Sequence, residues 1–339
     1  MNCFYYDDEL NVYHTLIEAI QSKRTVWFYY HDNVFKNVDW KVEPLLSLDE
    51  LYKLRAQQIR DKYPYVLLCY SGGNDSTAML EAFYYNNIHI DEILVVGAVS
   101  QDPHRRTDIN HNGDLYSNAF PLLSKLNLPN TKITFVDYTE FFRDGTLEQF
   151  SLIKQYGNEW TKHIGSFFSV HNLFWYDLKR FVGSKNEKET AVLFGADKVR
   201  VEYANDKAYT RFSNLSFSDY GNNYHDHNFH RVNFYTDADP EAIEIVKKQA
   251  HVFNRVLRRA EALGVPSPDR NDVLYRLRNP LSFQSEKSKF TILSARDTFM
   301  INKSDSEIYK MYVDGANHIR RNISLDRKNN IFTRPYWLE

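Results

Sequence analysis

An apolar run, two glycines and a polar segment follow one another in Tyr65-Val66-Leu67-Leu68-Cys69-Tyr70-Ser71-Gly72-Gly73-Asn74-Asp75-Ser76-Thr77. The run over 65–70 is typical of a strand that is buried on both faces. The residues from Ser76 to Tyr85 predict a helix. The glycines between them allow a tight turn and a close approach of the backbone to a ligand. The stretch therefore predicts a buried strand, a sharp turn and a helix in immediate succession.

The same alternation continues along the chain. Further apolar runs predict strands over 92–98, 132–136 and 190–195. The segments 115–126 and 159–183 predict helices between them. Strands that alternate with helices at this spacing indicate an α/β fold, in which a parallel sheet carries helices on both faces. Such sheets bind ligands at the carboxyl ends of their strands.

The alternating region is flanked by two parts of different character. We expect an N-terminal extension over 1–60, the α/β domain over 61–205, and a mixed, mainly helical C-terminal region over 206–339. The C-terminal region is where we expect substrate choice to be made.

Each flanking part has its own signals. In the extension, 10–20 predicts a helix, 25–30 a strand, and 47–62 a helix that begins with a capping box. In the C-terminal region, the polar residues 205–235 predict a functional loop or lid. A helix over 240–263 follows, with proline in its first turn and glycine after its end.

The glycine turn has the chemistry of an anion-binding site. Backbone N–H groups at the start of the helix point toward an anion, and the helix dipole favours it. Ser71, Ser76 and Thr77 add hydroxyl groups, and Asp75 beside a phosphate suggests a bridging Mg²⁺. Neither the Walker phosphate loop nor the dinucleotide-binding glycine pattern is present. A tight strand–helix turn without a ligand is the structural alternative.

The segment Ser71-Gly72-Gly73-Asn74-Asp75-Ser76 resembles the SGGxDS signature of the PP-loop ATP pyrophosphatase superfamily, which has a HUP-like fold. The resemblance covers roughly residues 60–205. Within the superfamily, the chain looks like an asparagine-synthetase-like or phosphoadenylyl-sulfate-reductase-like member that has no glutaminase domain. The roughly 70 residues before the loop are too few for a glutaminase domain. We therefore expect ammonia to come free from solution or from a partner.

The resemblance implies ATP and Mg²⁺ as cofactors. ATP would be cleaved between its α and β phosphates, pyrophosphate would leave into the 71–77 loop, and an amine or ammonia would attack the adenylated substrate. Charge on the pyrophosphate would be stabilised by loop N–H groups, hydroxyls and Mg²⁺. The adenosine would lie against the ends of the first two strands, at Leu68, Cys69, Tyr70, Val96, Gly97 and Ala98.

A second candidate site follows the fourth strand, in Gly195-Ala196-Asp197-Lys198. Asparagine-synthetase-like proteins carry a G-x-D loop in this place, whose aspartate shares the Mg²⁺ with the aspartate of the glycine turn. The resemblance therefore implies that Asp75 and Asp197 form a metal pair. Lys198 would neutralise charge on the phosphate that reacts. A polar turn at the end of a strand is the alternative.

Other charged groups are weaker candidates for substrate binding. His104, Arg105 and Arg106 follow the second strand, where they would grip a phosphate or carboxylate or form a solvated loop. The excursion over 205–235 contains three more cations that would close over phosphates, namely Lys207, Arg211 and Arg231. The histidine cluster over 225–230 resembles a metal site, but its spacing is not dependable for zinc. A substrate lid is the preferred interpretation of that cluster.

Composition narrows the class of protein. The 339 residues are 43% hydrophobic and 25% charged, which excludes a disordered chain, and Cys3 and Cys69 are too few for a thiolate metal site. Neither has a CxxC partner, which disfavours sulfur-transfer chemistry. No apolar run is long enough to span a membrane, so we expect a soluble, cytoplasmic protein without a membrane partner. A homodimer and a monomer both remain compatible with the sequence.

Charge is distributed unevenly. The net charge is −2, but residues 241–339 contain 18 Lys and Arg against 12 Asp and Glu. A basic segment of this kind fits a nucleotide, a phosphorylated substrate or a nucleic acid, and it also fits an ordinary solvated surface.

Three function classes follow. The first is an ATP-dependent, adenylate-forming ligase or transferase that acts on a small acid, amide or base. The second is an enzyme that modifies a tRNA or DNA base with the same chemistry. The third is a nucleotide-binding protein without catalysis.

Overall fold

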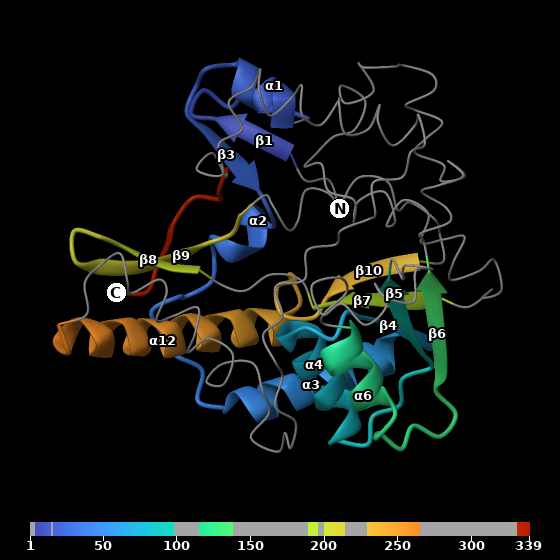
Figure 1. The fold of residues 1–339 in the computed structure, drawn as a ribbon. Coiled ribbons are helices and arrows are strands. Elements are labelled where there is room, and N and C mark those ends of the chain that lie inside the picture. Colours follow the sequence, from blue (N-terminus) through green and yellow to red (C-terminus); the bar gives the residue numbers. More distant parts are fainter. Residues whose placement is uncertain are drawn as a thin grey trace, which may run out of the picture.

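A computed structural model gives the fold of the chain (Figure 1). The residues that it describes are 4–14, 16–97, 115–137, 189–195, 200–213, 229–264 and 331–339. They form a five-stranded parallel sheet and two smaller, three-stranded antiparallel sheets. The fold is therefore of the α/β type, with two attached antiparallel units.

The central sheet has the strand order β10-β7-β4-β5-β6, and all its neighbours are parallel. The strands are β4 (Tyr65–Tyr70), β5 (Glu92–Gly97), β6 (Lys132–Asp137), β7 (Thr190–Phe194) and β10 (Phe229–Asn233). The apolar runs predict four of the five, and the structure confirms these four. The loop or lid predicted over 205–235 is wrong for β10, a strand at the edge of the sheet. An edge strand is bonded on one side only and does not need a continuous apolar run.

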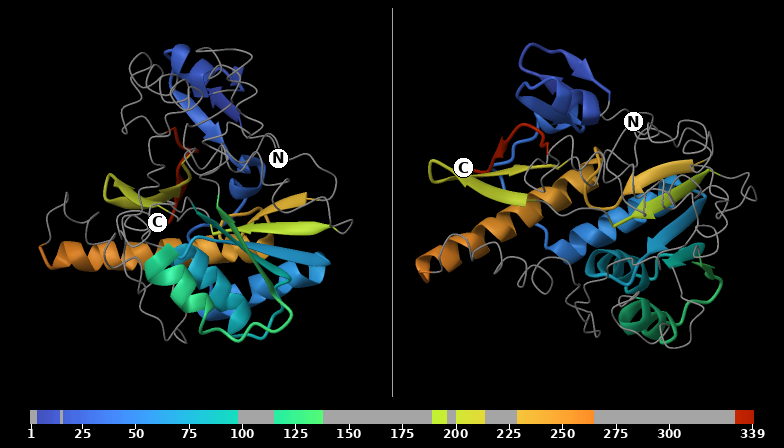
Figure 2. Two further views of the ribbon diagram at one scale, coloured as in Figure 1. Left: turned by 45° about the vertical axis from the view of Figure 1, so that its right-hand side comes forward. Right: turned by 45° about the horizontal axis from the view of Figure 1, so that its top comes forward.

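Four helices accompany this sheet (Figures 1 and 2). They are α3 (Leu48–Lys62), α4 (Asn74–Tyr84), α6 (Phe120–Leu123) and α12 (Pro240–Ala262). The capping box at the start of α3 is confirmed, because the Ser47 hydroxyl accepts from the Glu50 amide and the Glu50 carboxylate accepts from the Ser47 amide. Helices α3, α4 and α6 lie on one side of the sheet, and α12 runs along α3.

The helices predicted over 115–126 and 159–183 have different outcomes. The helix predicted over 115–126 is divided into a π-helical turn, Leu115–Ala119, and the short helix α6. Pro121 lies in the first turn of α6 and has no amide to donate to the preceding turn, which explains why regular α-helix starts late. The helix predicted over 159–183 lies outside the described residues.

In β4 and β7, side chains alternate between the two faces of the sheet, and both sets are buried. Leu68 and Leu193 belong to the main core together with α3 and α4. Leu67 and Val192 point to the opposite face and are 0% and 3% exposed. Burial on both faces explains why these strands read as unbroken apolar runs.

The N-terminal extension forms an antiparallel sheet of its own. It contains β1 (Phe4–Asp7), β2 (Val12–Tyr13), α1 (Leu16–Gln21), β3 (Val26–Tyr29) and α2 (Asp32–Phe35). The helix predicted over 10–20 is wrong before residue 16. The Asp7 carboxylate there accepts from the amides of Glu9 and Asn11 and closes a turn between two strands. Hydrogen bonds of this kind compete with a helix start.

The third sheet has the order β11-β9-β8. Its strands are β8 (Arg200–Ala204), β9 (Lys207–Arg211) and β11 (Tyr336–Trp337). Asn205 and Asp206 join β8 to β9 with φ values of 50° and 61°. This two-residue, left-handed turn is the usual hairpin connection. The predicted loop is therefore wrong for the start of the 205–235 segment as well, while residues 214–228 lie outside the described residues.

Aromatic rings join the extension to this third sheet. The Phe35 ring lies 5.0 Å from the ring of Phe212, and Trp40 stacks on Tyr336 at 5.0 Å between ring centroids. All four side chains are buried. Aromatic pairs at these distances add to the free energy gained by burying their area, so these contacts stabilise the packing of the extension against Phe212 and β11.

A buried arginine of α3 holds the segment that follows β10, residues 233–239. Arg55 donates from Nε to the carbonyl of Phe234 at 3.2 Å and from Nη2 to the carbonyl of Asn233 at 3.1 Å. Its Nη1 donates to the carboxylate of Asp239 at 2.7 Å. Burial tends to raise the pKa of Asp239, but the bond to Arg55 and its charge hold that pKa below the usual value. Because its N–H groups are paired, this guanidinium is compatible with full burial.

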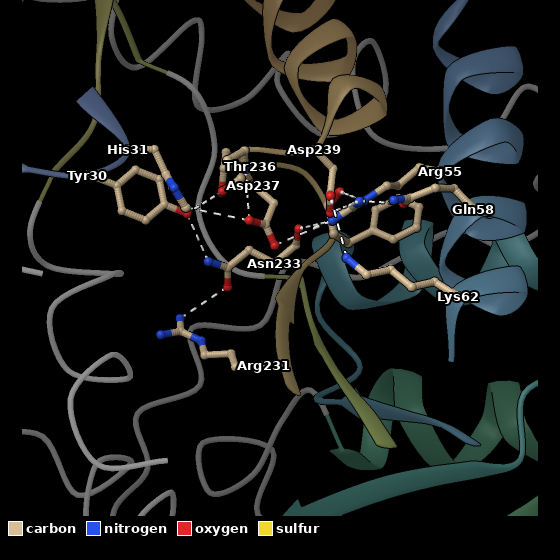
Figure 3. Close-up of polar contacts among 12 residues, drawn as sticks. Tyr30, His31, Arg55, Gln58, Lys62, Arg231, Asn233, Thr236, Asp237 and Asp239 are labelled. Atoms are coloured by element: carbon tan, nitrogen blue, oxygen red, sulfur yellow. Dashed lines mark hydrogen bonds and ion pairs between the residues drawn. The ribbon is translucent and has the colours of Figure 1, made fainter. Parts of the chain in front are cut away.

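The extension contacts the same segment from the other side (Figure 3). The Tyr30 hydroxyl donates to the carbonyl of Thr236 and accepts from the Asn233 side chain at 2.9 Å. Nε2 of His31 lies 3.5 Å from the carboxylate of Asp237. Burial lowers the pKa of His31, and the charge of Asp237 acts in the opposite direction. Segment 233–239 thus links β10, α3 and the extension.

We predict that Arg55→Met lowers the free energy of unfolding by about 3 to 5 kcal/mol, because it leaves two carbonyls and a carboxylate without their buried partner. The difference from the wild type should shrink as the pH falls below the ordinary aspartate pKa. There Asp239 becomes protonated, and the stabilisation that its lowered pKa represents is lost. Urea unfolding at several pH values measures both effects.

Arg258→Met is the matched control. Arg258 lies on α12 and pairs with Glu339 at 2.9 Å, with more than a third of its side chain exposed. Exposed pairs contribute up to about 1 kcal/mol. Equal losses in the two variants would contradict the role given to Arg55.

Candidate functional site

The turn between β4 and α4 has the backbone shape that its glycines allow. Gly72 has a φ of 81°, in the left-handed region that favours glycine. Gly73 is extended and caps α4, whose first residue is Asn74. The turn lies at the carboxyl end of β4, the central strand of the sheet. The sequence prediction of strand, turn and helix is confirmed.

Hydroxyl groups stabilise this turn from within. The Ser71 and Ser76 hydroxyls lie 3.0 Å apart, and the Ser71 hydroxyl accepts from the amide of Gly73 at 3.2 Å. The Thr77 hydroxyl lies 3.2 Å from the hydroxyl of Tyr70 and is fully buried. Ser71 is exposed, whereas Ser76 is 6% exposed. Ser71 is therefore accessible to a ligand from solvent, whereas the Thr77 hydroxyl lies in the core beside Tyr70.

The end of β7 lies directly against the first turn of α4. A Cβ atom built on Gly195 would lie 3.0 Å from the carbonyl carbon of Asp75 and 3.0 Å from the amide nitrogen of Ser76. Real Cβ atoms are almost never so close to backbone atoms. The pairing of β4 with β7 brings these segments together, so glycine at 195 permits a close contact with the turn.

Asp75 occupies the first turn of α4, where a carboxylate is favoured by the helix dipole. The residue is half-buried, and its Oδ1 atom is buried. Two tyrosines are close to it. Burial raises the pKa of Tyr235 and of Tyr52, and the charge of Asp75 raises both further. The Tyr235 hydroxyl donates to the backbone carbonyl of Asp75 at 2.7 Å.

Sequence reasoning did not identify Tyr235 as part of the site. Tyr235 lies in the segment 233–239, between β10, which the sequence did not predict, and α12. The local signal is weak, since Phe234 and Tyr235 are two consecutive aromatics that follow a largely polar segment. Their long-range contact with the turn is visible only in three dimensions.

The adenosine positions predicted on β4 and β5 lie at adjacent strand ends. Tyr70 pairs with Val95, one residue before Val96 and two before Gly97. Cys69 is buried, and burial raises the pKa of its thiol, with a further rise from the charge of Glu92. A thiol in this state is a poor nucleophile.

Arg231 lies on β10, two strands from the turn. Its Nη2 donates to the Asn233 side chain at 3.1 Å, and its guanidinium lies 5.4 Å from the ring of Phe194. This places a cation beside the end of β7, near Gly195. His230, from the predicted lid, is instead a half-buried residue of β10 with its ring 5.2 Å from the ring of Tyr63.

The other candidates are not brought to the turn by the described residues. Lys207 and Arg211 lie on β9, in a different sheet, and Arg211 pairs with Glu202 at 2.5 Å and covers the ring of Phe332. The remaining predicted residues lie outside the described residues, namely Ala98, His104, Arg105, Arg106, Asp197 and Lys198. Within the described ranges, no group of three or more metal-binding side chains occurs.

Comparison with protein-family models and with curated proteins gives no match to this chain. The site is therefore interpreted from its own geometry. That geometry is the N-terminus of an 11-residue helix, a left-handed glycine before it and an exposed serine, all at the carboxyl edge of a parallel sheet. This arrangement can bind an anion through backbone amides.

We predict that Gly195→Ala displaces the first turn of α4, because the added methyl group overlaps the Asp75–Ser76 peptide. The expected loss in unfolding free energy is about 1 to 3 kcal/mol, with faster hydrogen exchange at residues 73–77. Hydrogen-exchange mass spectrometry measures the local effect. Gly264→Ala is the control, since open space surrounds Gly264 and only its φ of 73° opposes a side chain. Unchanged exchange over 73–77 in Gly195→Ala would contradict the close contact.

Proposed function

We propose that this protein is an ATP pyrophosphatase-type enzyme of the PP-loop superfamily, which adenylates a substrate for attack by an amine or ammonia. The observation that carries the proposal is the conformation of Ser71–Ser76. The segment resembling the SGGxDS signature forms a left-handed glycine turn that opens α4 at the carboxyl end of a central parallel strand. A phosphate site requires a turn of this form in this place.

In the proposed complex, the turn would bind the phosphates of ATP and the neighbouring strand ends would bind its adenosine. The first-turn amides of α4 and the exposed Ser71 hydroxyl would hold the β and γ phosphates, because the first amides of a helix have no partner within the helix. The strand ends at Tyr70 and Gly97 would support the adenosine through their backbone. Charge that develops on the departing pyrophosphate would be stabilised by groups already in place before the reaction.

Mg²⁺ fits the proposed site through its carboxylate chemistry. Asp75 is in the first turn of α4, and its Oδ1 atom is buried. Asp197, which lies outside the described residues, would be the second carboxylate of the pair. Oxygen ligands of this kind are those that Mg²⁺ prefers. The ion would supply neutralisation of phosphate charge. Lys198 would add a further positive charge.

The substrate class is a small acid, amide or base, with ammonia or an amine as the nucleophile. Arg231 lies beside Phe194, near the end of β7, and it would bind an anionic group of this substrate. His104, Arg105 and Arg106 are further candidates for that role. Cys69 would take no part in the chemistry, because its thiol is buried.

A nucleic-acid substrate is the second candidate, and it rests on the basic C-terminal third. Several cations of α12 are engaged by carboxylates: Lys248 and Arg255 pair with Glu43, and Arg258 pairs with Glu339. Cations in such pairs contribute less attraction to phosphates. This favours a small-molecule substrate.

We predict that turnover of ATP yields AMP and pyrophosphate, observed by ³¹P NMR with Mg²⁺, ammonium and pooled acids, amides and bases. Asp75→Asn keeps the volume of the side chain and removes its charge, and we expect turnover to fall by at least about 100-fold with the fold retained. Asp61→Asn is the control, since Asp61 is an exposed residue of α3. Release of ADP and orthophosphate would overturn the proposal, and binding of ATP without turnover would indicate the non-catalytic class.

The nucleic-acid alternative has its own test. We expect tRNA and DNA to leave the rate of ATP cleavage unchanged and to bind weakly, as measured by fluorescence anisotropy at several salt concentrations. Binding that is tight at low salt and falls steeply with increasing salt would show phosphate contacts. If nucleic acid also stimulated AMP formation, the substrate would be a nucleic acid and not a small molecule.

A further inference from the structure

We infer that Tyr235 is a positioning residue, which fixes the first turn of α4 in the conformation that binds the phosphates of ATP. The inference rests on the proposed function for its ligand. Its structural basis is the contact between the Tyr235 hydroxyl and the backbone of α4, and this contact is present without any ligand.

The hydroxyl lies at the backbone of the first turn of α4. It donates to the Asp75 carbonyl at 2.7 Å. Asp75 and Met79 are four residues apart, so their carbonyl and amide are the pair that closes one turn of an α-helix. Tyr235 therefore bonds to the turn at the place where its geometry is set.

The same peptide group is restrained from a second direction. Gly195 contacts the Asp75–Ser76 peptide from the end of β7, while Tyr235 bonds to its carbonyl from the segment after β10. A hydrogen bond that a carbonyl accepts also polarises the amide of the same peptide. The Ser76 amide, one of the first-turn donors, thus becomes a stronger donor toward an anion in a fixed direction.

Tyr235 can act in this way because its own position is rigid. Its side chain is 0% exposed, and its ring lies 5.6 Å from the ring of Tyr52. The backbone on both sides is held, since Arg55 binds the carbonyl of Phe234 and Tyr30 donates to the carbonyl of Thr236. A buried hydroxyl on a backbone that is held on both sides restrains the turn more tightly than a solvent-exposed one.

The variant Tyr235→Phe removes the hydroxyl and keeps the ring. Tyr65→Phe is the matched control, because Tyr65 begins β4 at the opposite end from the turn and its hydroxyl donates to Glu92 at 2.8 Å. Calorimetry is used to measure the binding of pyrophosphate with Mg²⁺, of ATP with Mg²⁺, and of adenosine alone. Hydrogen-exchange mass spectrometry is used on the same proteins without ligand.

For Tyr235→Phe we expect pyrophosphate and ATP to bind about tenfold more weakly, the effect of losing one well-placed hydrogen bond. Adenosine affinity should stay the same, because the strand ends that would support it are not altered. Exchange over residues 73–79 should become about tenfold faster, with no change in β4 or β5. Tyr65→Phe should show none of these local effects. A purely structural role would instead weaken all three ligands together or raise exchange throughout the core.

The outcomes distinguish a failure of the positioning role of Tyr235 from a failure of the proposed function. If the wild type binds ATP and Tyr235→Phe binds it equally well, with unchanged exchange over 73–79, the positioning role is overturned and the proposed function stands. If the wild type binds neither ATP nor pyrophosphate, the proposed function fails. Exchange then still decides whether Tyr235 fixes the turn, but the assigned ligand is wrong.

Discussion

The buried guanidinium of Arg55 is the constraint on which the arrangement of the described residues depends. It lies on α3 and binds two carbonyls and a carboxylate of the segment 233–239. A charge at this depth is tolerated only when its donors are paired, so helix and segment must keep their relative positions. The N-terminal extension contacts the same segment through Tyr30. The segment then carries Tyr235 to the first turn of α4, and one arginine thereby links the periphery of the molecule to the candidate site.

The candidate site combines groups that lie far apart in the sequence. The turn supplies its amides and Ser71, the end of β7 contributes Gly195, and the segment after β10 contributes Tyr235. Parallel strands make this convergence possible, because their carboxyl ends meet at one edge of the sheet. The proposed ATP chemistry requires little of the chain beyond a rigid set of donors at that edge. Burial of Cys69 and Thr77 shows that hydrophobic packing continues directly behind the turn.

The sequence predicted the parts of the fold whose signal is local. The apolar runs at β4, β5, β6 and β7, the capping box of α3 and the full length of α12 all belong to this group. It failed for β10 and for the hairpin of β8 and β9. An edge strand is specified by its backbone pairing with β7, which its side chains do not reveal. The hairpin turns at two left-handed residues, Asn205 and Asp206, and polar residues of this kind are equally typical of a loop.

By itself, the sequence determined the strand, the glycine turn and the helix start, because Gly72 permits a backbone that other residues resist and because buried strands require continuous apolar residues. It also determined which residues form the turn, whose amides and hydroxyls are the candidate anion-binding groups. Only the tertiary structure decided which distant residues meet there. Gly195 contacts Asp75 through the pairing of β7 with β4, and Tyr235 reaches the same peptide because Arg55 fixes its segment. These contacts arise from the packing of separate elements, and no local pattern of residues encodes them.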